Sequence, residues 1–409
     1  MKQFMNTREA LVTEAIDGLL RASGARLARL DGYPHIRVVV RTDWDRSRVA
    51  LVSGGGSGHE PSHAGFVGQG MLTAAVCGDV FASPSVDAVL AGILAVTGKA
   101  GCLLIVKNYT GDRLNFGLAA ERARAFGFKV SMVIVDDDVA LPDLPQARGV
   151  AGTLFVHKIA GAMAEAGADL DTITAAAQGV IRGAISIGMS LDTCTVPGSP
   201  KEDRIGLGKA ELGLGIHGEA GVEQVDFGGA REAIDMVAGR LGPHMGPGDH
   251  VALLNNLGGT TPLEMSVLAE ELARSAIGPR IRWIVGPAAM MTSLDMHGFS
   301  VSLLPADDAR VRALAAPVAL TAWPGLNPLG QVEVRPLPDG LSPIQPVPSP
   351  HPARRAVIET CCKALIAVEK ELNALDAKSG DGDTGSTLAT AARALAAALA
   401  RPPLAEGTQ

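Results

Sequence analysis

The chain has 409 residues, a length that predicts two or three domains rather than a single core. Its composition is 47% hydrophobic and 19% charged, which excludes general disorder. The formal net charge of −7 argues against a nucleic-acid partner, because nucleic acid is bound by basic surfaces.

The chain shows no signal for export or for a membrane. Its first residues carry charges throughout and lack an apolar core, so they do not form a secretory signal. No stretch supplies the roughly 18 unbroken apolar residues that a membrane helix needs. The five cysteines include no CxxC pair, and we expect them to be reduced and mostly buried. These features predict a cytoplasmic protein that binds neither membrane nor nucleic acid.

Short β-branched runs alternate with helical patterns through the first half of the chain. Apolar residues at near-helical spacing predict a helix over Arg113–Phe126. Buried strands are predicted at Arg37–Val40, Val49–Ser53, Cys102–Val106 and Val130–Val135. Strand, helix and strand in this order predict an α/β domain with largely parallel pairing. Ligands of such sheets bind beyond the carboxyl ends of the strands.

A second α/β block follows, and then a linker and helices. Strands are predicted at Val251–Leu254 and Arg282–Val285, with a helix over Pro262–Glu271 between them and Thr261 as its N-cap. Seven prolines among the 17 residues 336–352 predict a semi-rigid linker. Helices are then predicted over 353–375 and 387–399. The expected domains are lobes at 1–191 and 192–335, the linker at 336–352 and an all-α segment at 353–409.

Two polar segments directly follow predicted strands. In Ser53–Pro61, four glycines among five residues let a ligand approach the main chain, but the lysine of a P-loop and the spacing of a dinucleotide fingerprint are absent. His59 in this segment is either a site residue or a buried turn histidine. In the segment from Lys107 to Asp112, the carboxylate is either the N-cap of the next helix or a general base. Lys107 is either a site residue or a solvated strand end.

Two further segments carry possible chemistry. In Gly213–Glu219, glycines flank His217 and leave its ring open to approach. The local sequence favours neither alternative, a nucleophilic histidine or an incidental loop residue. Asp376, Asp381 and Asp383 surround glycines, so their carboxylates can converge on a hard cation such as Mg²⁺. The EF-hand spacing is absent, and the alternative is an Asp-rich turn between two helices.

Taken in chain order, the segments GGGSGHEP, KNYTGD, GIHGE and GDGDTG resemble the dihydroxyacetone kinase family. The first three are similar to its ketose-binding domain, here about residues 1–335, and the fourth to the start of its nucleotide domain. The resemblance implies a two-lobed α/β domain with largely parallel or mixed sheets, followed by a short all-α segment. The GDGDTG form is similar to that of single-chain members, which implies ATP and Mg²⁺ as cofactors.

The resemblance also implies roles for individual residues. His217 would add to the ketose carbonyl and form a hemiaminal, a reaction that a neutral imidazole can perform and that glycerol, without a carbonyl, cannot undergo. Asp112 would accept the proton of the hydroxyl to be phosphorylated, and His59 would hydrogen-bond the substrate and assist proton transfer. The implied substrate-binding residues are Gly56, Ser57, Ser83 and Lys107. The implied Mg²⁺ ligands are Asp376, Asp381 and Asp383.

The expected function is therefore an ATP-dependent kinase that phosphorylates a terminal hydroxyl of dihydroxyacetone and forms a homodimer. Erythrulose is an alternative substrate, a non-catalytic ketose-binding regulatory module is an alternative class, and FMN cyclisation is a lesser possibility. The nucleotide domain of the family is an eight-helix barrel, whereas residues 353–409 hold three or four helices at about 12 residues each. We therefore expect this chain alone to bind ketose but to show little or no ATP-dependent phosphorylation.

Overall fold

The structure is a computed structural model that describes residues 3–141, 147–338, 347–402 and 404–405. The chain divides into two compact units, Met1–Gln331 and Val332–Gln409, and each is described by itself. Residues 339–346 of the predicted linker lie outside the described residues. Among the described residues, no helix has both the length and the apolar character that crossing a membrane requires.

The first sheet of unit 1 has six strands in the order β1-β2-β4-β3-β5-β6. The strands are β1 (Leu27–Arg29), β2 (Val38–Arg41), β3 (Ala50–Ser57), β4 (Ala74–Val80), β5 (Cys102–Lys107) and β6 (Val130–Val135). β3 pairs in parallel with β4 and β5, and β5 pairs in parallel with β6, whereas β1 and β2 form an antiparallel edge. The prediction of an α/β domain with largely parallel pairing is confirmed.

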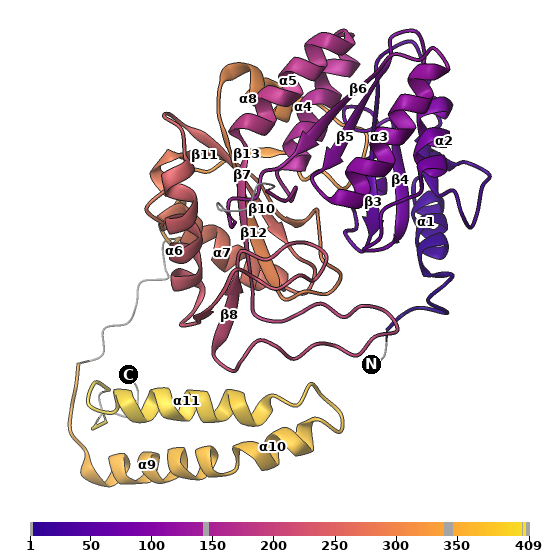
Figure 1. The fold of residues 1–409 in the computed structure, drawn as a ribbon. Coiled ribbons are helices and arrows are strands. Elements are labelled where there is room, and N and C mark those ends of the chain that lie inside the picture. The colour runs from indigo at the N-terminus through magenta and orange to yellow at the C-terminus, as the bar shows by residue number, and fades with distance from the viewer. Residues whose placement is uncertain (1–2, 142–146, 339–346, 403, 406–409) are drawn as a thin grey trace. The chain divides into compact units, whose positions relative to one another are not determined.

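Helices cover both faces of this sheet (Figure 1). They are α1 (Leu11–Ala22), α2 (Val86–Val96), α3 (Thr110–Ala125), α4 (Thr153–Glu165) and α5 (Leu170–Gly183), with a short 3₁₀ turn at Ala64–Phe66. α2 and α3 share one apolar core with the sheet, and α1, α4 and α5 share another with its opposite face. Such two-sided burial is typical of parallel sheets, whose strands read as continuous apolar runs.

The second sheet of unit 1 has seven strands in the order β13-β11-β10-β12-β7-β8-β9. The strands are β7 (Ile185–Ser190), β8 (Lys209–Leu212), β9 (Glu223–Asp226), β10 (His250–Asn256), β11 (Ile281–Ala289), β12 (Gly298–Pro305) and β13 (Leu326–Pro328). Only β10 and β11 pair in parallel, so this sheet is mixed. β7 precedes residue 192 but belongs to this sheet, and the boundary between lobes stays a prediction.

The helices of this part are α6 (Ala230–Leu241), α7 (Pro262–Arg274) and α8 (Asp308–Ala315), with 3₁₀ turns at Gly242–His244 and Gly278–Arg280. Side chains of β10 alternate between two cores: Val251 and Leu253 join the core that contains α4, whereas Ala252 and Leu254 pack with α6 and α7. One apolar layer therefore joins the two sheets, so unit 1 holds the loops of both sheets in fixed positions.

Helix boundaries differ in part from the predictions. Thr261 caps α7 as predicted, and its hydroxyl and Glu264 form a reciprocal capping box. α3 begins at Thr110 rather than Arg113, and its N-cap is Tyr109, whose side chain makes no capping hydrogen bond. The alternative reading of Asp112 as the N-cap is therefore wrong. Its carboxylate instead lies in the first turn of α3, where the helix dipole favours negative charge.

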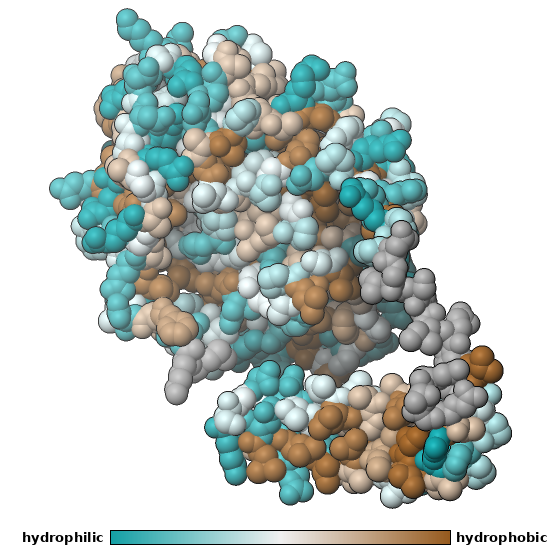
Figure 2. Space-filling model, turned by 180° about the vertical axis from the view of Figure 1, so that it is seen from behind, coloured by the Kyte–Doolittle hydropathy of each residue, from teal (hydrophilic) through white to brown (hydrophobic). Residues whose placement is uncertain are grey.

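The described residues of unit 2 form three helices: α9 (Pro352–Ala367), α10 (Glu369–Asp376) and α11 (Thr384–Ala398). The prediction of one helix over 353–375 is wrong, because Val368 leaves helical geometry and separates α9 from α10. Small residues of α11, among them Gly385 and Ala389, are buried against the other two helices. Apolar side chains also lie on the surface of this unit (Figure 2), including Val357, Leu375 and Leu395.

Candidate active site

The predicted site residues of unit 1 come from loops at the carboxyl ends of neighbouring strands. β3 and β5 are parallel neighbours, so the glycine-rich end of β3 and Lys107 at the end of β5 lie at one edge of the sheet. His217 belongs to the loop between β8 and β9 of the second sheet. Contacts across the two sheets join these loops, because the His59 Nδ1 proton is donated to the carbonyl oxygen of Thr292, 2.8 Å away, in the loop after β11.

Three aromatic rings surround the imidazole of His217. The ring centroids of Tyr109, His59 and Phe81 lie 4.2, 4.8 and 5.5 Å from that of His217, each with its plane steeply inclined to the imidazole. The His217 side chain remains 16% exposed, whereas His59 is buried and Tyr109 is partly buried. The rings hold the imidazole from several sides and leave part of it open to a small ligand.

Glu219 orients the same imidazole. Its Oε1 lies 3.5 Å from His217 Nδ1, and its Oε2 accepts a hydrogen bond of 2.7 Å from the His217 backbone N–H. Burial would raise the pKa of Glu219, but the hydrogen bonds and charge of His217 lower it below its ordinary value. A Cβ on Gly215 would lie 2.4 Å from this carboxylate and would displace it from its present position. The carboxylate therefore holds Nδ1 and leaves Nε2 of His217 available.

His59 is fully buried and has one ring nitrogen without a partner. Because Nδ1 donates to Thr292, Nε2 carries the lone pair, and it has no hydrogen-bond partner among the described residues. Burial lowers the pKa of His59 well below its ordinary value, and the charges of His217 and Lys107 add to this shift. A neutral His59 thus presents an acceptor nitrogen beside His217.

Lys107 and Asp112 form a buried pair. The Lys107 Nζ lies 3.9 Å from Asp112 Oδ2, and both side chains are almost completely buried. Burial lowers the pKa of Lys107, and the neighbouring carboxylate of Asp112 opposes that shift. The other carboxylate oxygen, Oδ1, is buried and has no hydrogen-bond partner in the part of the chain that the structure describes. It is a free acceptor at the amino end of α3.

The remaining predicted pocket residues border these groups. A Cβ on Gly56 would lie 2.7 Å from the backbone nitrogen of Ala82, so the main chain passes too closely for any other residue. The Ser57 hydroxyl donates to the carbonyl oxygen of Gly78 at 2.8 Å, and its lone pairs remain for a ligand. The Ser83 hydroxyl packs against Gly111 in the first turn of α3, so closely that a Cβ at Gly111 would lie 2.6 Å from Ser83 Oγ.

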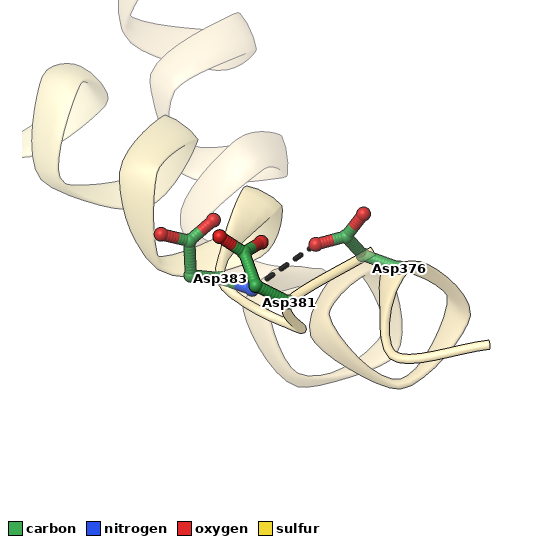
Figure 3. Close-up of side chains that lie close together, drawn as sticks. All are labelled: Asp376, Asp381 and Asp383. Atoms are coloured by element: carbon green, nitrogen blue, oxygen red, sulfur yellow. Dashed lines mark hydrogen bonds between the residues drawn. The ribbon is translucent and has the colours of Figure 1, made fainter. Parts of the chain in front are cut away.

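The three predicted metal ligands meet in unit 2 (Figure 3). Oxygens of Asp376, Asp381 and Asp383 all lie within 4.8 Å of one another, between α10 and α11. Asp376 Oδ2 accepts hydrogen bonds from the backbone N–H groups of Gly382 and Asp383 at 2.9 and 3.1 Å. The pKa of Asp383 is raised because Asp381 shares a proton with it and repels its charge. Three oxygen donors that repel each other fit a divalent cation such as Mg²⁺.

Sequence reasoning missed several residues of this site. Glu219 ends the segment Gly213–Glu219, but no role was predicted for it. Its position two residues after His217 could have indicated a carboxylate that orients the histidine. Tyr109, Phe81 and Thr292 carry no such signal, because their contacts with the site depend on loops that approach each other only in the folded chain.

Comparison with known proteins identifies the domain that carries this site. Residues 17–322 match the family described as the Dak1 domain, so the two-sheet unit with this site is a Dak1 domain. The chain is 48% identical over 404 residues to the dihydroxyacetone kinase of Citrobacter freundii, across 98% of this chain and 73% of that enzyme. It is 41% identical over 423 residues to the triokinase/FMN cyclase of Homo sapiens, across 96% of this chain and 72% of the relative.

A solved structure matches over nearly the same length. The crystal structure of the C. freundii kinase in complex with AMP-PNP and Mg²⁺ matches with a TM-score of 0.81 and 47% identity, across 99% of this chain and 76% of that one. The chain belongs to the dihydroxyacetone kinase family. The resemblance in its four sequence segments and the predicted two-lobed α/β fold with a helical C-terminal part are confirmed.

Proposed function

We propose that the chain is an ATP-dependent kinase for a terminal hydroxyl of dihydroxyacetone, which it holds as a hemiaminal on His217. Relatives that bear the name dihydroxyacetone kinase support the reaction, and the C. freundii structure with AMP-PNP and Mg²⁺ supports the cofactors. The observation that carries the proposal is a pair of buried acceptors, His59 Nε2 and Asp112 Oδ1, which have no partner among the described residues. The His59 ring lies 4.8 Å from the oriented imidazole of His217. Buried polar atoms rarely lack partners, so such a pair indicates a polar ligand.

The covalent step adds the imidazole N–H across the ketose carbonyl. The Nε2 lone pair of His217 forms the C–N bond, and the carbonyl π electrons move to oxygen, which takes up a proton. The Nδ1 proton of the imidazole is lost toward Glu219, whose Oε1 lies 3.5 Å away, so no other group leaves. Glycerol has no carbonyl and cannot undergo this step. Selectivity for ketoses over polyols then follows from the bond itself.

The phosphoryl transfer needs a base and a place for the nucleotide. Asp112 would take the proton of the attacking hydroxyl, and His59 Nε2 would accept a hydrogen bond from the substrate. Gly56, Ser57, Ser83 and Lys107 would line the pocket. When bound, Mg²⁺ supplies charge neutralisation for the phosphates of ATP. The ligands proposed for it are Asp376, Asp381 and Asp383, whose oxygens already converge.

Other functions remain alternatives to this proposal. A relative from Solanum lycopersicum, 45% identical, is called a putative 3,4-dihydroxy-2-butanone kinase, which favours a four-carbon ketose such as erythrulose as second substrate candidate. FMN cyclisation is named for the Homo sapiens relative. A structure named as a dihydroxyacetone kinase operon co-activator matches with 28% identity and a TM-score of 0.71, in line with a regulatory ketose-binding module. The converging Asp cluster favours the kinase.

Calorimetry and a coupled assay test the proposed function together. Dihydroxyacetone should bind the native protein, and glycerol should bind it far more weakly. In His217→Ala, the affinities for dihydroxyacetone and glycerol should become similar. With ATP and Mg²⁺ added, formation of ADP should depend on dihydroxyacetone. Equal affinity for ketose and polyol in the native protein would contradict the covalent mechanism. Selective binding without ADP formation would agree with the poor phosphorylation expected of this chain alone, and would not by itself favour the regulatory module.

A further inference from the structure

A buried histidine outside the predicted site contacts Lys107. His63 lies just after the glycine-rich segment, is only 4% exposed, and its Nε2 lies 2.8 Å from the Lys107 Nζ. The same amine donates to the carbonyl oxygen of Gly54 at 3.2 Å. An ammonium has three donors and no acceptor, so Nε2 of His63 accepts, and its ring proton is on Nδ1. His63 is thus a neutral partner of a buried cation.

The protonation state of His63 agrees with this geometry. Burial lowers the pKa of His63 well below its ordinary value, and the charges of Lys107, His157 and His59 lower it further. The ring therefore stays neutral over the working range of pH. A neutral acceptor stabilises the ammonium by a hydrogen bond without adding a second charge.

The contact with His63 governs the distance between the ammonium and the carboxylate. Lys107 makes its short contacts with Gly54 and His63, whereas Asp112 Oδ2 remains 3.9 Å away, beyond hydrogen-bond distance. Gly55 leaves the space in which this amine lies, since a Cβ there would be 2.6 Å from Nζ and 3.2 Å from Asp112 Oδ2. Without the acceptor on His63, the ammonium keeps the Gly54 carbonyl oxygen at 3.2 Å, and the nearest charged acceptor is the Asp112 carboxylate at 3.9 Å.

We infer that His63 is a positioning residue for the general base: it holds the Lys107 ammonium away from Asp112, so that the carboxylate stays free to take the substrate proton. This inference rests on the proposed function, because it concerns the same base. If the ammonium moved to an ordinary charge-assisted distance of about 2.8 Å, it would bind the carboxylate directly and weaken it as a base. Shortening the distance between Nζ and Oδ2 from 3.9 Å to about 2.8 Å strengthens their attraction. At an effective dielectric constant of about 20, this corresponds to a shift of about one pH unit in the pH–rate profile.

The test compares His63→Leu, His63→Gln and the control His157→Leu. His157 is buried beside His63, with ring centroids 5.3 Å apart, but its Nε2 contacts the Ser53 hydroxyl rather than Lys107. The control therefore removes a buried imidazole from the same region without touching the ammonium. His63 also lines a cavity of about 300 Å³ together with Ile16 and Leu19, so a changed side chain has room.

We expect His63→Leu to bind dihydroxyacetone as the native protein does. Its turnover with ATP and Mg²⁺ should fall about fivefold, and the acid limb of its pH–rate profile should move about one pH unit lower. His63→Gln, which keeps an acceptor, and His157→Leu should retain the native profile. An unmoved acid limb in His63→Leu, the same shift in His157→Leu, or loss of ketose binding in His63→Leu would overturn the inference.

Two further outcomes are distinguishable. If His63→Leu does not fold, His63→Asn replaces it, because its shorter side chain withdraws the acceptor while remaining polar, and the same shift is required of it. If the native protein neither binds ketose selectively nor forms ADP, the proposed function fails. A native protein that binds ketose selectively and forms ADP, even at the low rate expected of this chain alone, with an unshifted profile in the His63 variant, contradicts the positioning role alone.

Discussion

Replacement of Asp112 by Asn separates the chemistry of the site from its ability to hold the ketose. The proposed base contributes about 10²–10⁴ to the rate, so Asp112→Asn should lower turnover at least ~100-fold, or about 2.7 kcal/mol of transition-state stabilisation. Ketose binding should be largely retained, because the proposed covalent bond forms on His217. The two effects are measured separately by a coupled ATP assay and by calorimetry.

The same substitution has a calculable cost in stability. The buried pair between Lys107 and Asp112 is separated by 3.9 Å, which corresponds to about 4 kcal/mol of attraction at an effective dielectric constant of about 20. The measured loss should be smaller, because Lys107 keeps His63 and Gly54 as partners and can release its proton. Urea denaturation measures this loss.

Asp87→Asn is the matched control for this experiment. Asp87 lies in the first turn of α2 as Asp112 lies in the first turn of α3, but its side chain is 72% exposed and pairs with Arg122. Its loss should change neither turnover nor binding. Turnover of Asp112→Asn within about tenfold of the native value, with binding intact, would refute the assignment of Asp112 as the base.

Three other predictions concern the rest of the chain. Asp381→Asn should weaken Mg²⁺ binding in calorimetry because it removes one of three converging carboxylates, whereas Glu369→Gln, which breaks an ion pair with Arg393 in the same unit, should not; equal affinities would contradict the metal site. Burial lowers the pKa of Lys158 to about 8, so the unfolded chain binds this proton more tightly. Stability should therefore rise by up to about 2 kcal/mol between pH 8 and pH 10 relative to Lys158→Met, and a parallel pH dependence of the two proteins in urea denaturation would contradict it. Light scattering should give the mass of a homodimer at micromolar concentration, and a monomer mass would count against the proposed dimer.

Most of the fold of unit 1 could be predicted from the sequence. Runs such as Cys102–Val106 and Val130–Val135 are continuous and apolar because strands buried on both faces need no polar side. Parallel pairing then brought the ends of β3 and β5 to one edge, as expected. Pairing in the second sheet could not be predicted in the same way, because an apolar run looks alike in parallel and antiparallel neighbours.

The site was predictable where chemistry is local in sequence. The convergence of Asp376, Asp381 and Asp383 follows from short spacing around glycines. By contrast, the contact between His63 and Lys107 joins residues 44 positions apart, and no periodicity or spacing indicates it. The prediction of Asp112 as an N-cap was wrong because α3 begins two residues earlier, at Thr110. Helix ends are poorly defined by sequence, so the sequence alone did not identify the cap.

The covalent bond between His217 and the ketose is the central claim, and carbon NMR with dihydroxyacetone labelled at its carbonyl carbon tests it most directly. On binding to the native protein, the labelled carbon should move from the ketone region to that of a tetrahedral carbon bonded to oxygen and nitrogen. His217→Ala should show no such signal at any ketose concentration. A native protein that is saturated with dihydroxyacetone but shows only ketone or hydrate carbon would contradict the account.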